Sequence, residues 1–104
     1  MKTLKKQKMP KLLEALEATF GNEEFDATNV WGKAQDNSIL AAALEAEVER
    51  ARYSYKTWRR GDFNTSAIRK GLRQVEGLKA TYHPGYGAYG AHWTFRVPEN
   101  EFHR

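Results

Sequence analysis

Cysteine is absent from the sequence, which excludes disulfide bonds and thiolate-bound metal ions. No segment approaches the roughly 20 apolar residues of a membrane-spanning helix. The basic start MKTLKKQKMPK also lacks the continuous apolar stretch that a signal peptide needs. The 104 residues, 40% of them hydrophobic, are enough for one modest core and too few for two. We therefore expect a single-domain cytoplasmic protein that does not enter a membrane.

The charged residues are distributed unevenly along the chain. Residues 1–11 contain five lysines and no acid, residues 12–55 contain three basic and nine acidic side chains, and residues 56–98 contain eight basic and two acidic ones. Clustered Lys and Arg side chains attract phosphate, so this pattern indicates one side that faces a polyanion and an acidic back. An equally good interpretation is that the acidic helices are solvated and attract the basic segments within the monomer.

Two helices are predicted in the first third of the chain. They follow a basic arm, residues 1–8, which we expect to be flexible. Pro10 suits the first turn of a helix, and the apolar stripe that follows ends at Gly21. After a polar break, Asp26 or Thr28 is placed to cap a short second helix. The stripe of the first helix consists of Leu12, Leu13, Leu16 and Phe20.

The segment SILAAALEAEVERARYSY predicts the longest helix, because it is rich in strong helix formers. Asn37 or Ser38 is placed to cap it. Glu47 interrupts the apolar face of this helix, and the sequence offers no explanation for it. The apolar face itself consists of Leu40, Leu44, Val48, Ala51 and Tyr55.

A further short helix is predicted after residue 63, with Asn64, Thr65 or Ser66 placed to cap its first turn. Ile68, Leu72 and Val75 fall at positions i, i+4 and i+7, so they share one buried face. Gly77 is placed to stop the helix, since glycine readily adopts the left-handed conformation of a C-terminal residue. The opposite face carries the donors Ser66, Arg69, Lys70 and Arg73.

Two strands follow this helix. Apolar and polar residues alternate strictly over residues 78–83 and 92–97, which is typical of strands with one buried face. The fold class is therefore α+β: three to four helices and a C-terminal two-stranded antiparallel hairpin. We expect one domain over residues 9–98 and a flexible tail over residues 99–104. The side chains predicted on the buried face of the hairpin are Leu78, Ala80, Tyr82, Trp93, Phe95 and Val97.

Neither a catalytic site nor a cofactor is expected. The loop GYGAYG matches G-x-G-x-x-G, but a dinucleotide-binding loop opens a helix, whereas the strand HWTFRV follows here. A protein kinase would need further motifs, and only fourteen residues follow Gly90. His83 and His92 project from the same face of adjacent strands but lack a third ligand for a metal ion. We interpret the loop as a hairpin tip and the two histidines as anion contacts.

The strongest functional signal is a basic helix with a basic hairpin beside it. The helix TSAIRKGLRQVEGL and the strands KATYH and HWTFRV follow one another in an order that resembles the second half of a winged helix-turn-helix domain. The resemblance implies DNA binding, with the helix in the major groove and the hairpin along the backbone. The positions that it assigns to DNA contact are Ser66, Arg69, Lys70 and Arg73 on the helix, and Lys79, Tyr86, Tyr89 and Arg96 on the hairpin.

Two hypotheses about function follow. The first is a small non-catalytic DNA-binding protein, a repressor or accessory factor, in which Arg59, Arg60 and Lys79 hold phosphates and the lysine arm from Lys2 to Lys11 adds non-specific attraction. The second is a protein-binding inhibitor or adaptor of the kind that phages and mobile elements encode, including anti-CRISPR-type proteins. It would use the acidic residues Glu45, Glu47 and Glu49 together with loops rich in Tyr and Trp. A third hypothesis is a homodimer that forms through the long helix.

Overall fold

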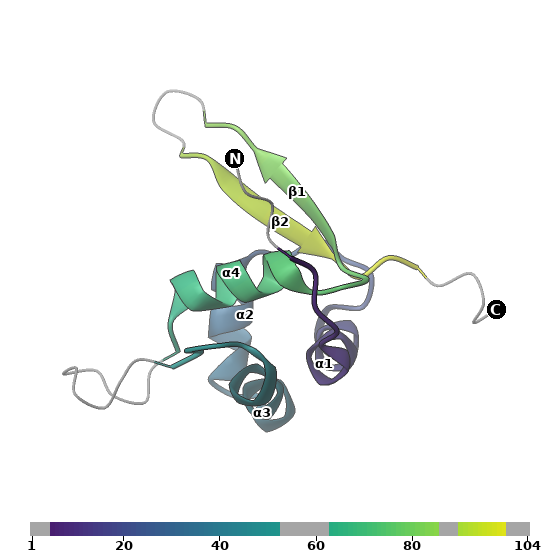
Figure 1. Ribbon diagram of the computed structural model, residues 1–104, viewed down its shortest axis with the longest axis vertical. Coiled ribbons are helices and arrows are strands. Elements are labelled where there is room, and N and C mark those ends of the chain that lie inside the picture. The colour runs from purple at the N-terminus through teal and green to yellow at the C-terminus, as the bar shows by residue number, and fades with distance from the viewer. Residues whose placement is uncertain (1–4, 53–62, 86–89, 100–104) are drawn as a thin grey trace.

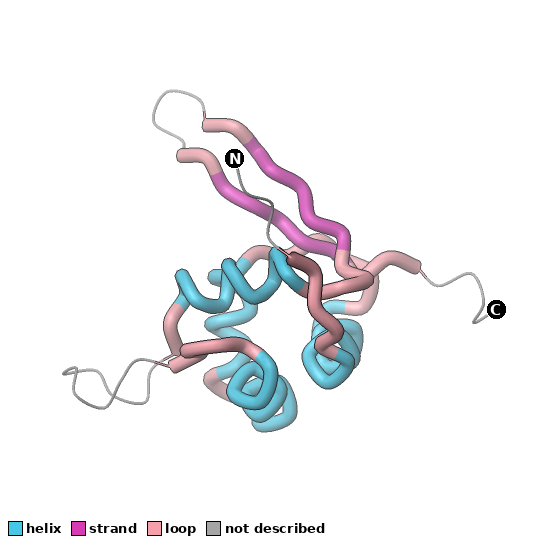
Figure 2. The backbone as a smooth tube through the Cα atoms, in the orientation of Figure 1, coloured by secondary structure: helices cyan, strands magenta, loops and turns pink. Residues whose placement is uncertain are grey.

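The computed structural model describes residues 5–52, 63–85 and 90–99. Within them, the helices are α1 (Pro10–Phe20), α2 (Ala27–Ala34), α3 (Ser38–Glu47) and α4 (Thr65–Gln74) (Figure 1). The strands β1 (Lys79–His83) and β2 (His92–Arg96) form an antiparallel hairpin, which Figure 2 shows extending away from the helices. The predicted α+β class, mostly helical with a C-terminal two-stranded hairpin, is confirmed. In this described part of the chain, no helix has the length and apolar character needed to cross a membrane.

The sequence explains where the first two helices begin and end. α1 begins at Pro10 and ends before Gly21, whose φ of +63° favours a residue without a Cβ. At the start of α2, the Asn29 backbone N–H donates to Asp26 Oδ1 (2.8 Å) and the Asp26 N–H donates to Asn29 Oδ1 (3.0 Å). Asp26 is therefore the N-cap, one of the two predicted alternatives. Gly77 also has a positive φ (+93°), but it lies beyond the end of α4 and does not terminate it.

The helix predicted from SILAAALEAEVERARYSY is shorter in the structure, so the prediction of its end was wrong. α3 ends at Glu47, Val48 is extended, and Arg50 has a φ of +59°, which interrupts a right-handed helix. Tyr55, the predicted last residue, lies outside the described residues. The cause is tertiary packing: a Cβ added to Gly71 of α4 would lie 3.0 Å from both methyl groups of Val48. Burial of Val48 against α4 outweighs the helix propensity of the segment.

Glu47, the unexplained polar residue on the apolar face of α3, caps a different helix. Its Oε1 accepts a hydrogen bond from the backbone N–H of Leu12 in the first turn of α1 (2.8 Å). Met9, the N-cap of α1, makes no side-chain cap hydrogen bond. Glu47 therefore supplies the acceptor that the local sequence lacks, and its charge lies at the positive end of the helix dipole. This bond joins α3 to α1.

Phe95 joins the hairpin to the helices. Its backbone N–H and C=O pair with those of Phe25 in the α1–α2 loop, at N···O distances of 2.7 and 2.8 Å. The Phe25 ring stacks on Phe20 with centroids 4.3 Å apart. Near this junction the predicted burial of one hairpin face is confirmed by Leu78 and Phe95; farther out it was wrong, because Tyr82 is 52% exposed. The helices contribute to the same core Leu12, Leu16, Val30, Leu40, Leu44, Ile68 and Leu72.

The described part of the basic arm is attached to the end of α4. The Gln7 N–H donates to the carbonyl of Gln74 (2.7 Å), and the Gln7 carbonyl accepts from the Glu76 N–H (2.9 Å). The ammonium group of Lys6 donates to the carbonyl of Arg73 (3.0 Å), where a cation is favoured by the negative end of the helix dipole. Two residues of the arm are therefore held beside α4.

The contact between Val48 and Gly71 can be tested with two helical glycines. Gly71→Ala should lower the free energy of unfolding by about 1 kcal/mol, because overpacking a core costs about 1–3 kcal/mol and exceeds the gain in helix propensity. Gly32→Ala in α2 is the matched control, because nothing lies within 4 Å of the added Cβ. It should raise the free energy of unfolding by about 0.5–1 kcal/mol. Urea unfolding measures both, and stabilisation by Gly71→Ala would contradict the packing argument.

The cap on α1 gives a second prediction. Glu47→Ala should lower the free energy of unfolding by about 1 kcal/mol, the usual cost of a lost helix cap, and Glu47→Gln should lose less because it keeps an oxygen acceptor. The control is Glu14→Ala, an exposed position in α1, which should change stability by less than about 0.5 kcal/mol. Equal effects of Glu47→Ala and Glu14→Ala in urea unfolding would show that the hydrogen bond to Leu12 contributes nothing.

Candidate functional site

α4 exposes a basic face on the side away from the core. Asn64 Oδ1 accepts hydrogen bonds from the backbone N–H groups of Ser66 (3.1 Å) and Ala67 (3.3 Å), which defines the start of the helix. The side chains of Ser66, Arg69 and Lys70 are exposed. Neither Arg69 nor Lys70 makes an ion pair with any described residue. These two cations therefore stand on a firmly packed helix without a neutralising partner in the described chain.

Arg73, one turn further along α4, is positioned differently. Its side chain is half-buried, and its guanidinium carbon lies 4.5 Å from the centroid of the Trp93 ring. This cation–π contact connects α4 to β2 and stabilises the hairpin position by about 0.5–1 kcal/mol. Arg73 therefore extends the basic face of α4 toward the aromatic face of the hairpin.

The two faces of the hairpin differ in chemistry. The strand register pairs Lys79 with Arg96, Thr81 with Thr94 and His83 with His92, so these six polar side chains share one face. The opposite face carries the pairs Ala80–Phe95 and Tyr82–Trp93. Because Arg73 contacts Trp93, Lys79 and Arg96 project from the face turned away from this contact. Of the predicted hairpin contacts, the two described ones, Lys79 and Arg96, thus lie on the hairpin face that does not contact α4.

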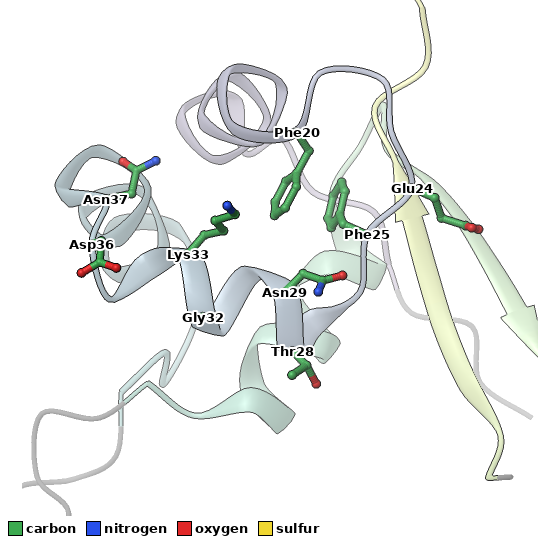
Figure 3. A pocket seen from close by; sticks show the side chains of 9 residues that line it. All are labelled: Phe20, Glu24, Phe25, Thr28, Asn29, Gly32, Lys33, Asp36 and Asn37. Atoms are coloured by element: carbon green, nitrogen blue, oxygen red, sulfur yellow. The ribbon is translucent and has the colours of Figure 1, made fainter.

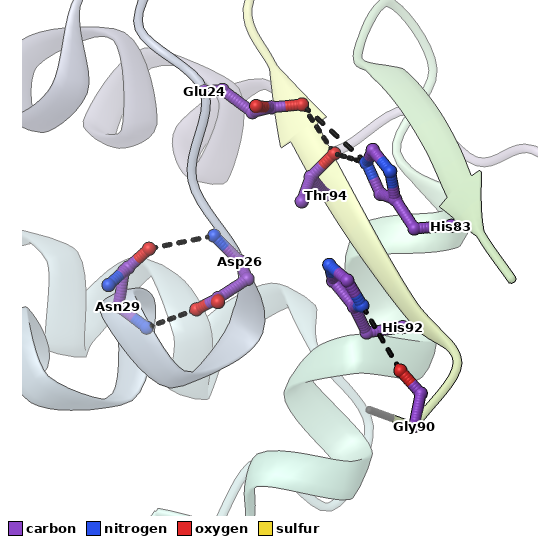
Figure 4. Close-up of polar contacts among 7 residues, drawn as sticks. All are labelled: Glu24, Asp26, Asn29, His83, Gly90, His92 and Thr94. Atoms are coloured by element: carbon purple, nitrogen blue, oxygen red, sulfur yellow. Dashed lines mark hydrogen bonds and ion pairs between the residues drawn. The ribbon is translucent and has the colours of Figure 1, made fainter. Parts of the chain in front are cut away.

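The polar face of the hairpin holds an acid that the sequence did not predict there. Thr94 Oγ1 donates to Glu24 Oε2 (2.6 Å) and lies 2.8 Å from His83 Nε2 (Figure 4). Since the single hydroxyl proton of Thr94 points to Glu24, the ring nitrogen of His83 is the donor in the second bond. The hydrogen bond from Thr94 holds the pKa of Glu24 below its ordinary value, and the positive potential of His83, Arg96 and His92 acts in the same direction. The carboxylate of Glu24 thus occupies part of the predicted anion-binding face.

The two histidines lie together, as the strand pairing predicts. The rings of His83 and His92 stack with centroids 4.8 Å apart and an interplanar angle of 14°. Glu24 Oε2 lies 3.8 Å from His83 Nε2. Among the described residues, no group of three or more His, Asp or Glu side chains is arranged to hold a metal ion. We assign the histidine pair no metal site.

A groove of about 710 Å³ runs beside α2 (Figure 3). The stacked rings of Phe20 and Phe25 line it, with an interplanar angle of 12°. Its polar lining carries charges of both signs, and this mixture does not favour a polyanion. The remaining lining residues are Glu24, Thr28, Asn29, Gly32, Lys33, Asp36 and Asn37.

Two of the three glutamates considered for a protein partner are engaged within the chain. Glu45 Oε2 lies 2.6 Å from a terminal guanidinium nitrogen of Arg52, and Glu47 caps α1. Glu49 lines a groove of about 430 Å³ between the end of α3 and α4, together with Lys70. Two acidic residues from the middle of the sequence, Glu45 and Glu47, therefore stabilise contacts within the chain.

The hydrogen bond between Thr94 and Glu24 gives a pH-dependent prediction. Thr94→Val should raise the pKa of Glu24 toward its ordinary value, as measured by NMR titration of its side-chain carboxyl carbon. Thr81→Val, on the same face but without a hydrogen bond to Glu24, should leave this pKa unchanged. Because the pKa is lowered in the folded state, the stabilisation is present above the unfolded-state pKa and is lost as the pH falls through the folded-state value. The stability difference between wild type and Thr94→Val should therefore shrink on acidification.

The structure places three predicted contact residues, Ser66, Arg69 and Lys70, on one exposed face of α4, with Arg73 at its edge. Lys6 is held against the end of the same helix, a position that could not be predicted because the segments that pair are distant in the sequence. The predicted residues that lie outside the described part of the chain are Arg59, Arg60, Tyr86 and Tyr89. No family model matches the chain, and no curated protein or solved structure matches it.

Proposed function

We propose that the protein binds DNA, without catalysis, through a surface formed by the exposed face of α4 and the basic arm held beside it. The observation that carries this proposal is the presence of Arg69 and Lys70, exposed and without an ion pair in the described chain, on a helix whose other face is buried. Desolvating an unpaired surface cation costs little when a phosphate replaces its water. Each such contact also releases a counterion from DNA.

In this proposal side chains of α4 contact bases and those of the arm contact phosphates. Arg69 has a forked donor that can contact base edges in a major groove, and Ser66 is a short donor one turn before it. Lys5, Lys6 and Lys8 flank the paired residue Gln7 and can contact phosphates beside α4. Such phosphate contacts orient the helix on the duplex, whereas sequence preference would come from its side chains.

The resemblance to a winged helix-turn-helix domain supports the same proposal through the order α4, β1, β2. The proposal differs from the family pattern at the hairpin, because Lys79 and Arg96 lie on the face away from the contact between Arg73 and Trp93. The connection from Val48 to Asn64 is also longer than the turn of about 3–4 residues that joins the two helices of that motif. We therefore assign DNA contact to α4 and the arm. A role as repressor or accessory factor fits a binder of this size.

The proposal is tested by removing two charges from α4 and, in a control, two charges elsewhere. Arg69→Ala/Lys70→Ala should weaken binding to a labelled duplex and make the plot of log affinity against log salt shallower by about 0.9, since each lost phosphate contact removes about 0.9 from the slope and Arg69 is assigned to base edges. Lys11→Ala/Lys33→Ala lowers the net charge equally, with both residues exposed on α1 and α2. It should keep nearly the wild-type slope. Equal loss in both double variants, or no wild-type binding at low salt, would refute the proposal.

A further inference from the structure

We infer that the Tyr82–Trp93 face of the hairpin stacks on an unpaired base, so that the preferred ligand is duplex DNA with a single-stranded extension. This inference rests on the proposed function and specifies its substrate class. It starts from the exposure of Tyr82, whose side chain belongs to the apolar face of the hairpin but lies beyond the core.

Tyr82 contributes few contacts to the fold. Its ring packs against Trp93, with centroids 5.2 Å apart and an interplanar angle of 57°. Among the described residues it makes no other aromatic or hydrogen-bonded side-chain contact, and 52% of it is exposed to solvent. Isolated exposed aromatic residues are common on protein surfaces. Tyr82, however, is not isolated from the basic face of α4.

A continuous row of side chains connects α4 to Tyr82. The guanidinium of Arg73 lies over one part of the Trp93 ring, and the Tyr82 ring lies beside the same indole. Arg69 precedes Arg73 by one helical turn, and Lys6 is bonded to the backbone at Arg73. The cations of α4 therefore continue, through Arg73, into the ring pair of the hairpin. Proteins that bind single strands without sequence preference combine these two features, a basic path for the backbone and aromatic rings for the bases.

The ring face determines the class of ligand. A base inside a duplex is covered on both sides by its neighbours and presents only its edges in the grooves. A Tyr ring can stack only on a base with a free face, as in a single strand. Arg73, whose guanidinium lies against the Trp93 ring that Tyr82 contacts, favours a phosphate backbone over an apolar peptide. With α4 on the duplex, the hairpin is placed to contact the strand that continues past it.

The test compares three labelled DNAs of one sequence: a blunt duplex, the same duplex with a single-stranded extension, and the single strand alone. The wild-type protein should bind the extended duplex about 5- to 150-fold more tightly than the blunt one, the range expected for stacking of one base. Tyr82→Ala should remove this preference and keep the affinity for the blunt duplex, which shows that the fold is intact. Tyr82→Phe should retain the preference. Thr81→Ala, on the opposite face, is the control and should behave as wild type.

A second measurement reports stacking directly. A 2-aminopurine base in the extension should lose fluorescence on binding the wild-type protein and Tyr82→Phe but not Tyr82→Ala. Equal affinity of the wild-type protein for blunt and extended duplexes, or a preference that survives in Tyr82→Ala, would overturn the inference. If Arg69→Ala/Lys70→Ala still weakens duplex binding in that case, the proposed function stands. Absence of binding to all three DNAs would overturn both.

Discussion

The close approach of Val48 to Gly71 is the constraint on which the position of α4 depends. A Cβ at this point of the helix would lie 3.0 Å from both valine methyl groups, so Val48 would have to shift to accommodate it. The contact turns the chain out of α3 and brings it across the buried side of α4, where Ile68 and Leu72 are also fully buried. Once that side faces inward, the helical period directs Arg69 and Lys70 outward. The exposed basic face is therefore a consequence of the packing on the other side of the same helix.

Two backbone pairings then place the remaining elements around α4. Phe25 and Phe95 exchange two hydrogen bonds, which ties the hairpin to the α1–α2 loop and brings Trp93 to Arg73. Gln7 makes two further backbone bonds just past the end of α4, so the neighbouring lysines lie beside that helix. The basic surface combines the first residues of the chain with a helix near its middle. Its charge is concentrated by tertiary structure, since the lysine run and α4 are far apart in the sequence.

Features that depend on local chemistry could be predicted from the sequence, and those that depend on distant contacts could not. Helix α1, the strand alternation and the short sets of cap candidates that include Asp26 and Asn64 follow from side chains within a few residues. The end of α3 does not, because its cause is Val48 packing on a residue of another helix. Glu47 was recognised as an anomaly without an explanation, since its partner is a backbone N–H in α1. For the site, the exposed residues of α4 were predictable, whereas the contact of Glu24 with the hairpin was not.

Glu24 makes the polar face of the hairpin less positive, which affects how that face compares with α4 as a surface for a polyanion. On the polar face of the hairpin, this carboxylate lies among Thr94 and the two histidines and offsets part of the charge of Lys79 and Arg96. On the exposed face of α4, no described acid pairs with Arg69 or Lys70. At physiological ionic strength charges are screened beyond about 8 Å, so each face acts on a ligand largely through its own nearby groups. On the hairpin face Glu24 therefore offsets part of the positive charge, whereas Arg69 and Lys70 of α4 make no ion pair with a described acid, although Glu49 lines the same groove as Lys70. The proposed phosphate contacts therefore fall on α4, and Tyr82 lies on the hairpin face opposite to that of Glu24.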